Sequence, residues 1–154
     1  MITTRACTLL LFLFLGCGGQ TPKELASSEP LTFEHVPLNG LRASEVPAQE
    51  RVFFEEQAWR EFWTTYGNGN SPPIDFQKEG VAVASAGARP NSGYGLRILD
   101  VRKEPDAVRV FVEETVPNRR LGYAAVIVYP NDAVRFAKVR ETVLFCSCQK
   151  VASE

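Results

Sequence analysis

The sequence predicts an α+β fold, mainly β, in which antiparallel sheet structure carries one amphipathic helix packed on a face. Two observations lead to this prediction. Residues 55–66 have the apolar spacing of a helix, and the chain after residue 80 places branched apolar side chains in short runs between turn residues. Consecutive strands joined by short turns pair antiparallel, and one helix covering such a sheet gives an α+β domain.

The helix is expected over Glu55 to Tyr66. Its apolar face consists of four aromatic side chains at positions i, i+3, i+4 and i+7, namely Trp59, Phe62, Trp63 and Tyr66. Gly67 follows the last turn, where glycine commonly ends a helix. The aromatic stripe has two interpretations, a seam packed onto the sheet or a ligand platform, and the amphipathic pattern favours the seam.

The strands are expected on both sides of this helix. Proline and Asn-Gly punctuation before it leaves room only for short strands near 31–36 and 51–54. The clearest alternation lies at 108–113, where every second residue is valine. The other expected strands cover 81–85, 94–101, 124–129, 133–139 and 142–145.

The start of the chain is typical of an export signal. Arg5 is followed by an apolar run over 6–15 and then by Gly16 and Cys17, which is the charged, apolar and small-residue order of a secretory signal. The segment Leu13-Phe14-Leu15-Gly16-Cys17 resembles a bacterial lipobox, in which a peptidase cuts before a cysteine that carries diacylglycerol. Residues 1–16 are therefore predicted to be a lipoprotein signal peptide and Cys17 to be lipidated. The alternative is an ordinary signal with Cys17 incidental.

The remaining organisation follows from this start. Residues 17–30 are small and polar and are predicted to be a flexible tether, and 31–150 a single β-rich domain. Acyl chains would hold the protein in the bacterial cell envelope, outside the cytoplasm. Gly18, in place of an aspartate, is similar to lipoproteins of two-membrane bacteria that reach the outer membrane. The formal net charge of −1 offers no basic excess for nucleic acid.

A second cysteine feature lies near the C-terminus. Cys146 and Cys148 form a Cys-x-Cys pair, which outside the cytoplasm can be oxidised. On a strand both side chains project to one face, with Cα atoms near the outer limit for a bridge. Three interpretations stay open: structural or unpaired thiols, a redox pair, and half of a metal site. Because His35 is the only histidine and no second cysteine pair exists, no metal and no cofactor are expected.

Catalytic motifs are missing from the sequence. It contains no Gly-x-Ser-x-Gly segment, phosphate loop or dinucleotide fingerprint. The adjacent pairs Glu55-Glu56 and Glu113-Glu114 should point to different sides of their elements, so neither is a facing acid/base pair. His35 has no partner of the kind a catalytic histidine needs and is expected at the surface. The sequence therefore predicts a protein that is not an enzyme.

One loop is the candidate partner-binding segment. Gly87-Ala88-Arg89-Pro90-Asn91-Ser92-Gly93-Tyr94 joins two expected strands. It can be a structural turn in which Gly93 supplies a positive φ and Tyr94 begins the next strand. It can also be a recognition loop, because Arg and Tyr are enriched as interface anchors. The candidate binding residues are Gly87, Arg89, Pro90, Gly93 and Tyr94.

The order of short motifs resembles the C-terminal domain of the protease complex subunit PrcB family. The resemblance covers 53–139. Two departures stand out: Asn118-Arg119-Arg120 replaces a small, Gly-rich run, and the Cys-x-Cys tail lies beyond the match. The motifs are the tryptophans of the helix (Trp59, Trp63), Pro73-Ile74-Asp75-Phe76, Gly87-x-Arg89-Pro90-x-x-Gly93-Tyr94, Thr115-x-Pro117 and Tyr129-Pro130.

This resemblance implies a function. Members of the family are secreted or lipid-anchored, carry no family catalytic residues, and take their name from a lipoprotein that helps a surface serine protease mature. The expected function is a lipid-anchored, extracytoplasmic accessory protein that binds another protein, a surface or periplasmic protease foremost, without catalysis. Two alternatives remain. The Arg89–Tyr94 loop is similar to the Asn-Pro-Thr-Thr-Gly-Tyr loop of chagasin-like protease inhibitors, and Cys146 with Cys148 would suit a small thiol redox protein.

Overall fold

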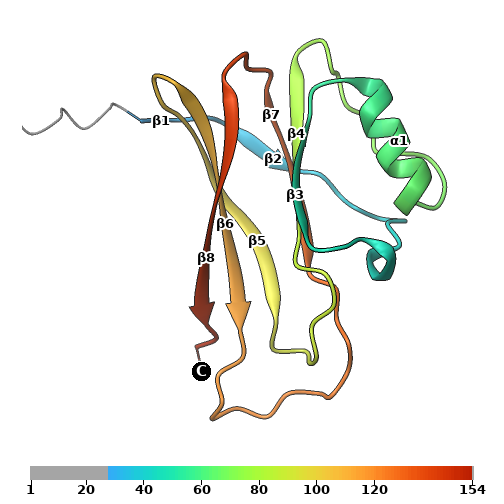
Figure 1. The fold of residues 1–154 in the computed structure, drawn as a ribbon, viewed down its shortest axis with the longest axis vertical. Coiled ribbons are helices and arrows are strands. Elements are labelled where there is room, and N and C mark those ends of the chain that lie inside the picture. The colour runs from blue at the N-terminus through green and yellow to red at the C-terminus, as the bar shows by residue number, and fades with distance from the viewer. Residues whose placement is uncertain (1–27, 154) are drawn as a thin grey trace, which may run out of the picture.

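The computed structural model describes residues 28–153. The predicted signal peptide, Cys17 and nearly all of the predicted tether lie outside these residues. The described chain forms two four-stranded sheets and one α-helix (Figure 1). This arrangement confirms the predicted mainly-β fold with a single packed helix.

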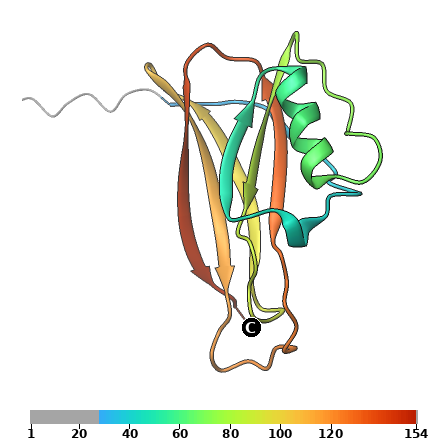
Figure 2. The same cartoon turned by 45° about the vertical axis from the view of Figure 1, so that its right-hand side comes forward.

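The two sheets are named here by their place in the fold. The central sheet has the order β2-β7-β4-β3, and the outer sheet has the order β1-β5-β6-β8. The helix α1 packs on one face of the central sheet and the outer sheet covers its other face, so the fold has three layers (Figure 2). The bounds are β1 Glu29–Pro30, β2 Phe33–His35, a 3-10 turn Ala43–Glu45, β3 Gln49–Phe53, α1 Glu56–Tyr66, β4 Glu79–Ser85, β5 Gly95–Lys103, β6 Ala107–Val116, β7 Asn131–Ala137 and β8 Thr142–Val151.

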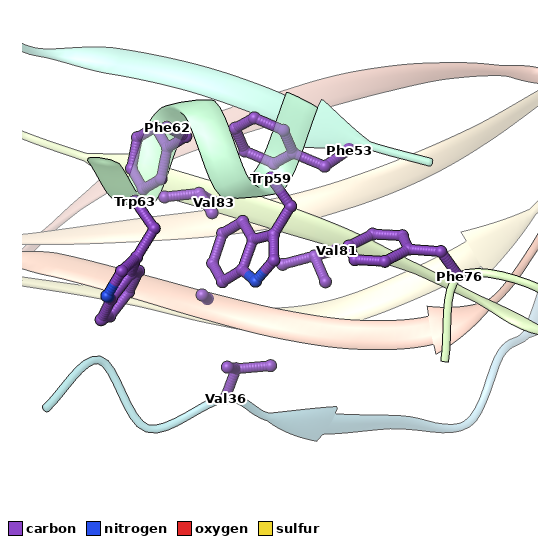
Figure 3. Packing of buried hydrophobic residues seen from close by; sticks show 9 residues of the cluster. Val36, Phe53, Trp59, Phe62, Trp63, Phe76, Val81 and Val83 are labelled. Atoms are coloured by element: carbon purple, nitrogen blue, oxygen red, sulfur yellow. The ribbon is translucent and has the colours of Figure 1, made fainter. Parts of the chain in front are cut away.

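The aromatic stripe of α1 is a packed seam, as predicted. Trp59, Phe62 and Trp63 are only 2–3% exposed and lie against strands of the central sheet (Figure 3). The Trp59 and Phe53 rings meet edge to face with centroids 5.3 Å apart, a favoured aromatic geometry. Burial of these rings ties the helix to β3 and β4.

Gly67 ends α1, as predicted, but without a positive φ. Its φ is −95°, and its N–H donates to the Trp63 carbonyl at 2.6 Å. A Cβ on Gly67 would lie 2.5 Å from Trp63 Nε1. Glycine is therefore required here because the backbone passes directly against the indole ring.

The second core lies between the two sheets. Val108, Val110 and Val112 of β6 are at most 2% exposed and pack with side chains of the central sheet. The alternation predicted for this strand is thus confirmed. Strand β4 is buried on both faces, because α1 covers one and the outer sheet the other, which explains why its sequence is almost continuously apolar.

The predicted strand over 124–129 is wrong. Residues 117–130 form a connection from β6 in the outer sheet to β7 in the central sheet, and in it only Val128 forms a bridge, with Arg89. The apolar run reflects a loop that crosses between layers, where Val126 and Ile127 are exposed. Local periodicity cannot separate a short apolar loop from a short strand.

Strand β8 differs from its prediction in length and direction. It continues past Phe145 through the Cys-x-Cys pair to Val151, and it pairs parallel with β6, whereas the other strand pairs are antiparallel. The parallel pair arises because the chain leaves β6, runs through β7 in the other sheet, and returns. Such a crossover connection is what parallel neighbours need.

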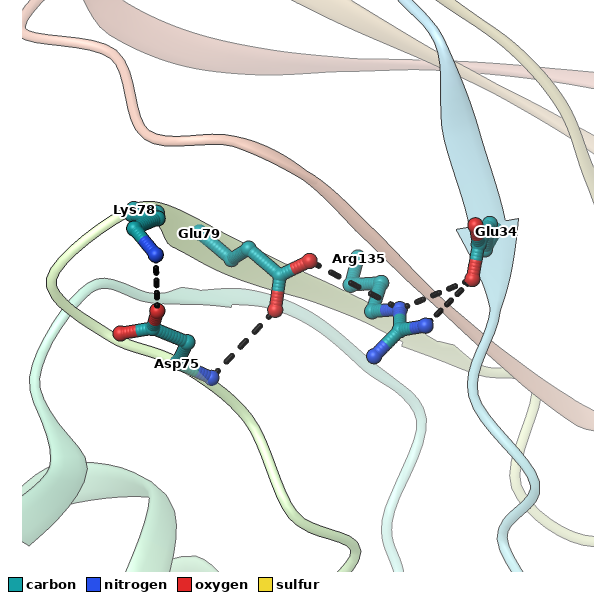
Figure 4. A network of polar contacts seen from close by, with 5 residues as sticks. All are labelled: Glu34, Asp75, Lys78, Glu79 and Arg135. Carbon is teal, nitrogen blue, oxygen red and sulfur yellow. Dashed lines mark hydrogen bonds and ion pairs between the residues drawn. The ribbon is translucent and has the colours of Figure 1, made fainter.

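Strand β2 is held at the edge of the central sheet by charged side chains. Arg135 of β7 bonds to Glu34 of β2, and its Nε lies 3.8 Å from Glu79 of β4 (Figure 4). Glu79 also accepts the Asp75 backbone N–H at 3.3 Å, and Asp75 pairs with Lys78 at 3.2 Å. The hydrogen bond that Arg135 donates to Glu34 raises the pKa of Arg135. These contacts add to the backbone pairing of β2 with β7, and β2 has only three residues, none of them fully buried.

Candidate partner-binding site

Two loops meet at one end of the molecule. Residues 86–94 connect β4 to β5, and residues 117–130 connect β6 to β7; both lie at the bottom of Figure 1. The backbones of Arg89 and Val128 exchange two hydrogen bonds of 2.8 and 3.0 Å. Ser92 also accepts the Ala124 N–H at its hydroxyl and donates its own N–H to the Ala124 carbonyl. We call this surface the loop end.

Arg89 is directed into the loop end rather than presented to solvent. Its Nε donates to Glu114 Oε1 of β6 at 2.6 Å, and the Gln149 amide of β8 donates to the other oxygen at 3.2 Å. The Arg89 guanidinium also lies 5.9 Å from the ring centroid of Tyr94, within cation–π range. Arg89 thereby joins its loop to β6, and Glu114 in turn joins β6 to Gln149 of β8.

The charge pair changes the titration of Glu114. Its pKa lies below the ordinary value of 4.5, chiefly because Arg89 donates a hydrogen bond to the carboxylate. Partial burial opposes this shift, and the Gln149 bond adds to it. Glu113, the neighbour of Glu114 along β6, instead lies 3.7 Å from Lys150. The two glutamates have separate partners, in keeping with their predicted opposite directions.

A groove of about 860 Å³ opens at the loop end. Pro90 and Tyr94 come from the candidate loop, while Arg119 and Arg120, both exposed, come from the second loop. The two arginines stand where the PrcB-like pattern has small residues. The groove is lined by Ala88, Arg89, Pro90, Tyr94, Glu114, Val116, Pro117, Asn118, Arg119, Arg120, Gln149 and Val151.

The positive φ expected at Gly93 is wrong. Gly87 is the glycine of this loop with a positive φ, at 68°, and Gly93 does not have one. A Cβ at Gly93 would lie 2.7 Å from Pro117 Cβ and 2.7 Å from the Tyr123 ring. Gly93 is therefore required by the close approach of the second loop, which no local pattern could reveal.

Two exposed side chains of the site were not predicted from the sequence. Val126 is 50% exposed and Ile127 is 60% exposed, both in the 117–130 loop. The apolar run that contains them indicated a strand instead. These two neighbouring residues are exposed apolar area beside the bridge between Arg89 and Val128.

Substitution of Gly93 provides a test of how the two loops are joined. We expect Gly93→Ala to lower the free energy of unfolding by about 1–3 kcal/mol, the usual cost of overpacking. The Tyr123 ring cannot easily move away, because its hydroxyl accepts the Asn118 N–H at 3.0 Å. Urea denaturation measures the change.

Gly122→Ala is the matched control. A Cβ at Gly122 would meet no atom within 4 Å, and the residue belongs to the same end of the molecule. Gly122→Ala should change the free energy of unfolding by no more than about 0.5 kcal/mol, as for an ordinary surface substitution. Equal effects of the two substitutions would contradict the close-packing role of Gly93.

The other candidate residues do not line the groove of the loop end. Cys146 and Cys148 are free thiols on β8, and Cys146 Sγ accepts a hydrogen bond from Arg109 at 3.6 Å. His35 is exposed, and its Nδ1 lies 3.0 Å from Asp132 Oδ1. Within residues 28–153, no three His, Cys, Asp or Glu side chains gather as a metal site. No helix of that same range is long and apolar enough to cross a membrane.

The fold and the loop end define a helix-covered, two-sheet β domain with a groove between two of its loops. The family described as PrcB C-terminal matches residues 81–137. This range runs from β4 to the end of β7 and includes both loops of the loop end. The predicted PrcB resemblance is confirmed there, whereas α1 and β8 lie outside the match. Searches of curated proteins and of solved structures found no match.

Proposed function

We propose that this protein is a non-catalytic accessory subunit that binds a protease through its loop end and is held in the cell envelope by a lipid on Cys17. The observation that carries the proposal is the PrcB C-terminal match over the residues that build both loops. The PrcB family is named for a protease complex subunit. The lipobox-like segment ending at Cys17 supports the anchor.

The geometry of the loop end supports its use as the binding surface. Hydrogen bonds between the two loops and the Arg89–Glu114 pair hold the backbone in place before binding, which limits the entropy that a partner must remove. Val126 and Ile127 supply exposed apolar area. Arg119 and Arg120 on the groove favour an acidic region of the partner.

The same geometry favours an accessory role over a chagasin-like inhibitor. A loop that inserts into a protease cleft has to present its side chains to the protease. Here the Arg89 side chain points back to Glu114, and residues 89 and 92 are bonded to the neighbouring loop. The candidate surface is therefore broad and made of two segments.

A site-specific cross-linking experiment tests this function. The full chain carries a photoreactive amino acid in place of Ile127 and is expressed in cells that produce it naturally. We expect light to join it to a protease, identified by mass spectrometry. The control position is Asp106, exposed in the β5–β6 turn at the opposite end of these strands, where no protease adduct should form.

The outcomes separate the candidate functions. An adduct at Ile127 that contains no protease, or equal adducts at both positions, would refute the proposal. Loss of the captured protease's activity on adding the protein would instead favour the inhibitor.

The anchor is tested in the same cells with Cys17→Ala, which should leave the protein uncleaved or in the soluble fraction. A Cys17→Ala variant that is cleaved and still sediments with membranes would overturn the prediction that a lipid on Cys17 anchors the protein.

A further inference from the structure

Strand β8 is the long, unprotected edge of the described fold. The sheets end at β1, β2, β3 and β8. Strand β1 has two residues, one of them Pro30, β2 has three, and β3 has five with exposed Glu50 and Arg51. Strand β8 has ten residues, contains no proline, and bears one charge, Lys150. Short length, charge and proline are the usual protection of an edge against pairing, and β8 has little of it.

The backbone of β8 shows which residues face this open edge. Its pairing with β6 is continuous from Thr142 to Val151, and the Ala152 N–H donates to the Val116 carbonyl at 2.9 Å. Backbone groups of successive strand residues point to alternate sides. Even-numbered residues of β8 therefore direct them to β6, and odd-numbered residues, including Ser147, direct them to the open edge.

The cysteines on either side of Ser147 are arranged for a second copy of the same strand. With Ser147 opposite Ser147 in an antiparallel pair, Cys146 of each chain faces Cys148 of the other. The Ser147 pair carries the hydrogen bonds, so the two cysteine pairs are the closely spaced, non-hydrogen-bonded kind, with Cα atoms about 4.5 Å apart. That distance lies within the range for a disulfide.

A bridge within one chain fits less well. Cys146 and Cys148 lie two residues apart on a regular strand, which separates their Cα atoms by about 6.6 Å and leaves their Cβ atoms pointing in parallel. A disulfide needs Cβ atoms about 3.5–4.5 Å apart. An internal bridge would therefore distort β8.

We propose that β8 is a self-association edge: two copies pair antiparallel about a two-fold axis at Ser147, and oxidation locks the pair through two Cys146–Cys148 disulfides between chains. The same register places Lys150 opposite Leu144 of the second copy, so the two lysines do not face each other. It also places Val143 opposite Val151 on the inner face. The two outer sheets become one continuous sheet.

The oxidant is a small-molecule disulfide such as oxidised glutathione. A thiolate of one chain attacks it, releases one reduced glutathione and forms a mixed disulfide. The facing thiolate of the other chain then attacks the protein sulfur of this mixed disulfide, forms the bridge between chains and releases the second reduced glutathione. Each bridge removes two electrons and two protons from two thiols. Two oxidised glutathione molecules are consumed per dimer, and four reduced glutathione molecules are released.

A mixing experiment with single-cysteine chains tests both the contact and its register. The full chain, in detergent, carries Cys7→Ser and Cys17→Ser so that only the β8 thiols remain. One preparation adds Cys146→Ser and the other adds Cys148→Ser. In the proposed register each variant places serine opposite its own remaining cysteine, while a mixed pair places Cys146 opposite Cys148.

We expect the mixture to form disulfide-linked dimers with oxidised glutathione at least about tenfold faster than either variant alone, because paired thiols react at an effective concentration near millimolar. Non-reducing electrophoresis and mass spectrometry of the linked peptides measure this. Equal rates in all three samples, bridges between identical cysteines, or no linked dimer would overturn the proposal. A chain with both thiols that forms an internal bridge and stays monomeric would overturn it as well.

Ser147 offers a separate test without disulfides. Ser147→Pro removes the N–H that faces the open edge, and Ser147→Ala is the matched control, because both lose the hydroxyl bond to Glu50. Under reducing conditions we expect the wild type and the alanine variant to sediment with a concentration-dependent dimer, and the proline variant as a monomer. Equal dimerisation of the proline and alanine variants would contradict pairing through this edge.

Discussion

Trp63→Ala should lower the free energy of unfolding by about 3–5 kcal/mol, the usual cost of removing a large aromatic side chain from a core. Trp63 is 3% exposed and lies 5.7 Å, centroid to centroid, from Trp59. Gly67 packs against its indole, so the lost volume cannot be refilled from that side without moving the end of α1. Thermal and urea unfolding of the full chain measure the change.

Glu61→Ala is the control for this substitution. Glu61 lies on the exposed face of the same helix, and its replacement should change stability by no more than about 0.5 kcal/mol. A Trp63→Ala variant that unfolds like the wild type, yet loses cross-linking at Ile127, would contradict the seam and return the aromatic stripe to the role of a ligand platform.

Arg89→Met should lower stability by about 1–3 kcal/mol at pH 7, because it leaves the Glu114 carboxylate partly buried without its strongest hydrogen bond. The effect should depend on pH. In the wild type the pKa of Glu114 is below 4.5, so the pair stabilises the fold fully above the carboxyl group's unfolded pKa. That contribution is lost as pH falls through the folded pKa.

The difference in free energy of unfolding between wild type and Arg89→Met should therefore be largest near neutral pH and become smaller in acid. In the variant, burial should move the pKa of Glu114 upward. Adding Glu114→Gln should recover part of the lost stability, since an amide carries no charge to desolvate. Arg97→Met, at an exposed arginine of β5, is the control and should change little. A loss of stability that is the same at pH 7 and in acid would contradict this role of the ion pair.

Elements whose side chains repeat at a regular spacing could be located from the sequence. Trp59, Phe62 and Trp63 predicted the seam of α1, and the valines at 108, 110 and 112 predicted a strand with one buried face. These patterns are readable because burial on one face imposes the period of the element on the residues. The loop at 87–94 was also located, since glycine and proline mark a connection whatever surrounds it.

Long-range contacts decided the rest. The division of the strands into two sheets, and the parallel pairing of β6 with β8, depend on how segments far apart in the chain meet. The run at 124–129 became an exposed loop because it has to cross between layers, and Gly93 is glycine because Pro117 and Tyr123 approach it. The sequence by itself determined the helix at 55–66, the strand at 108–113 and the connection at 87–94. Only the tertiary structure joined that loop to Ala124 and Val128 and left β8 with an open edge, because such neighbours come from packing between segments and no local spacing records them.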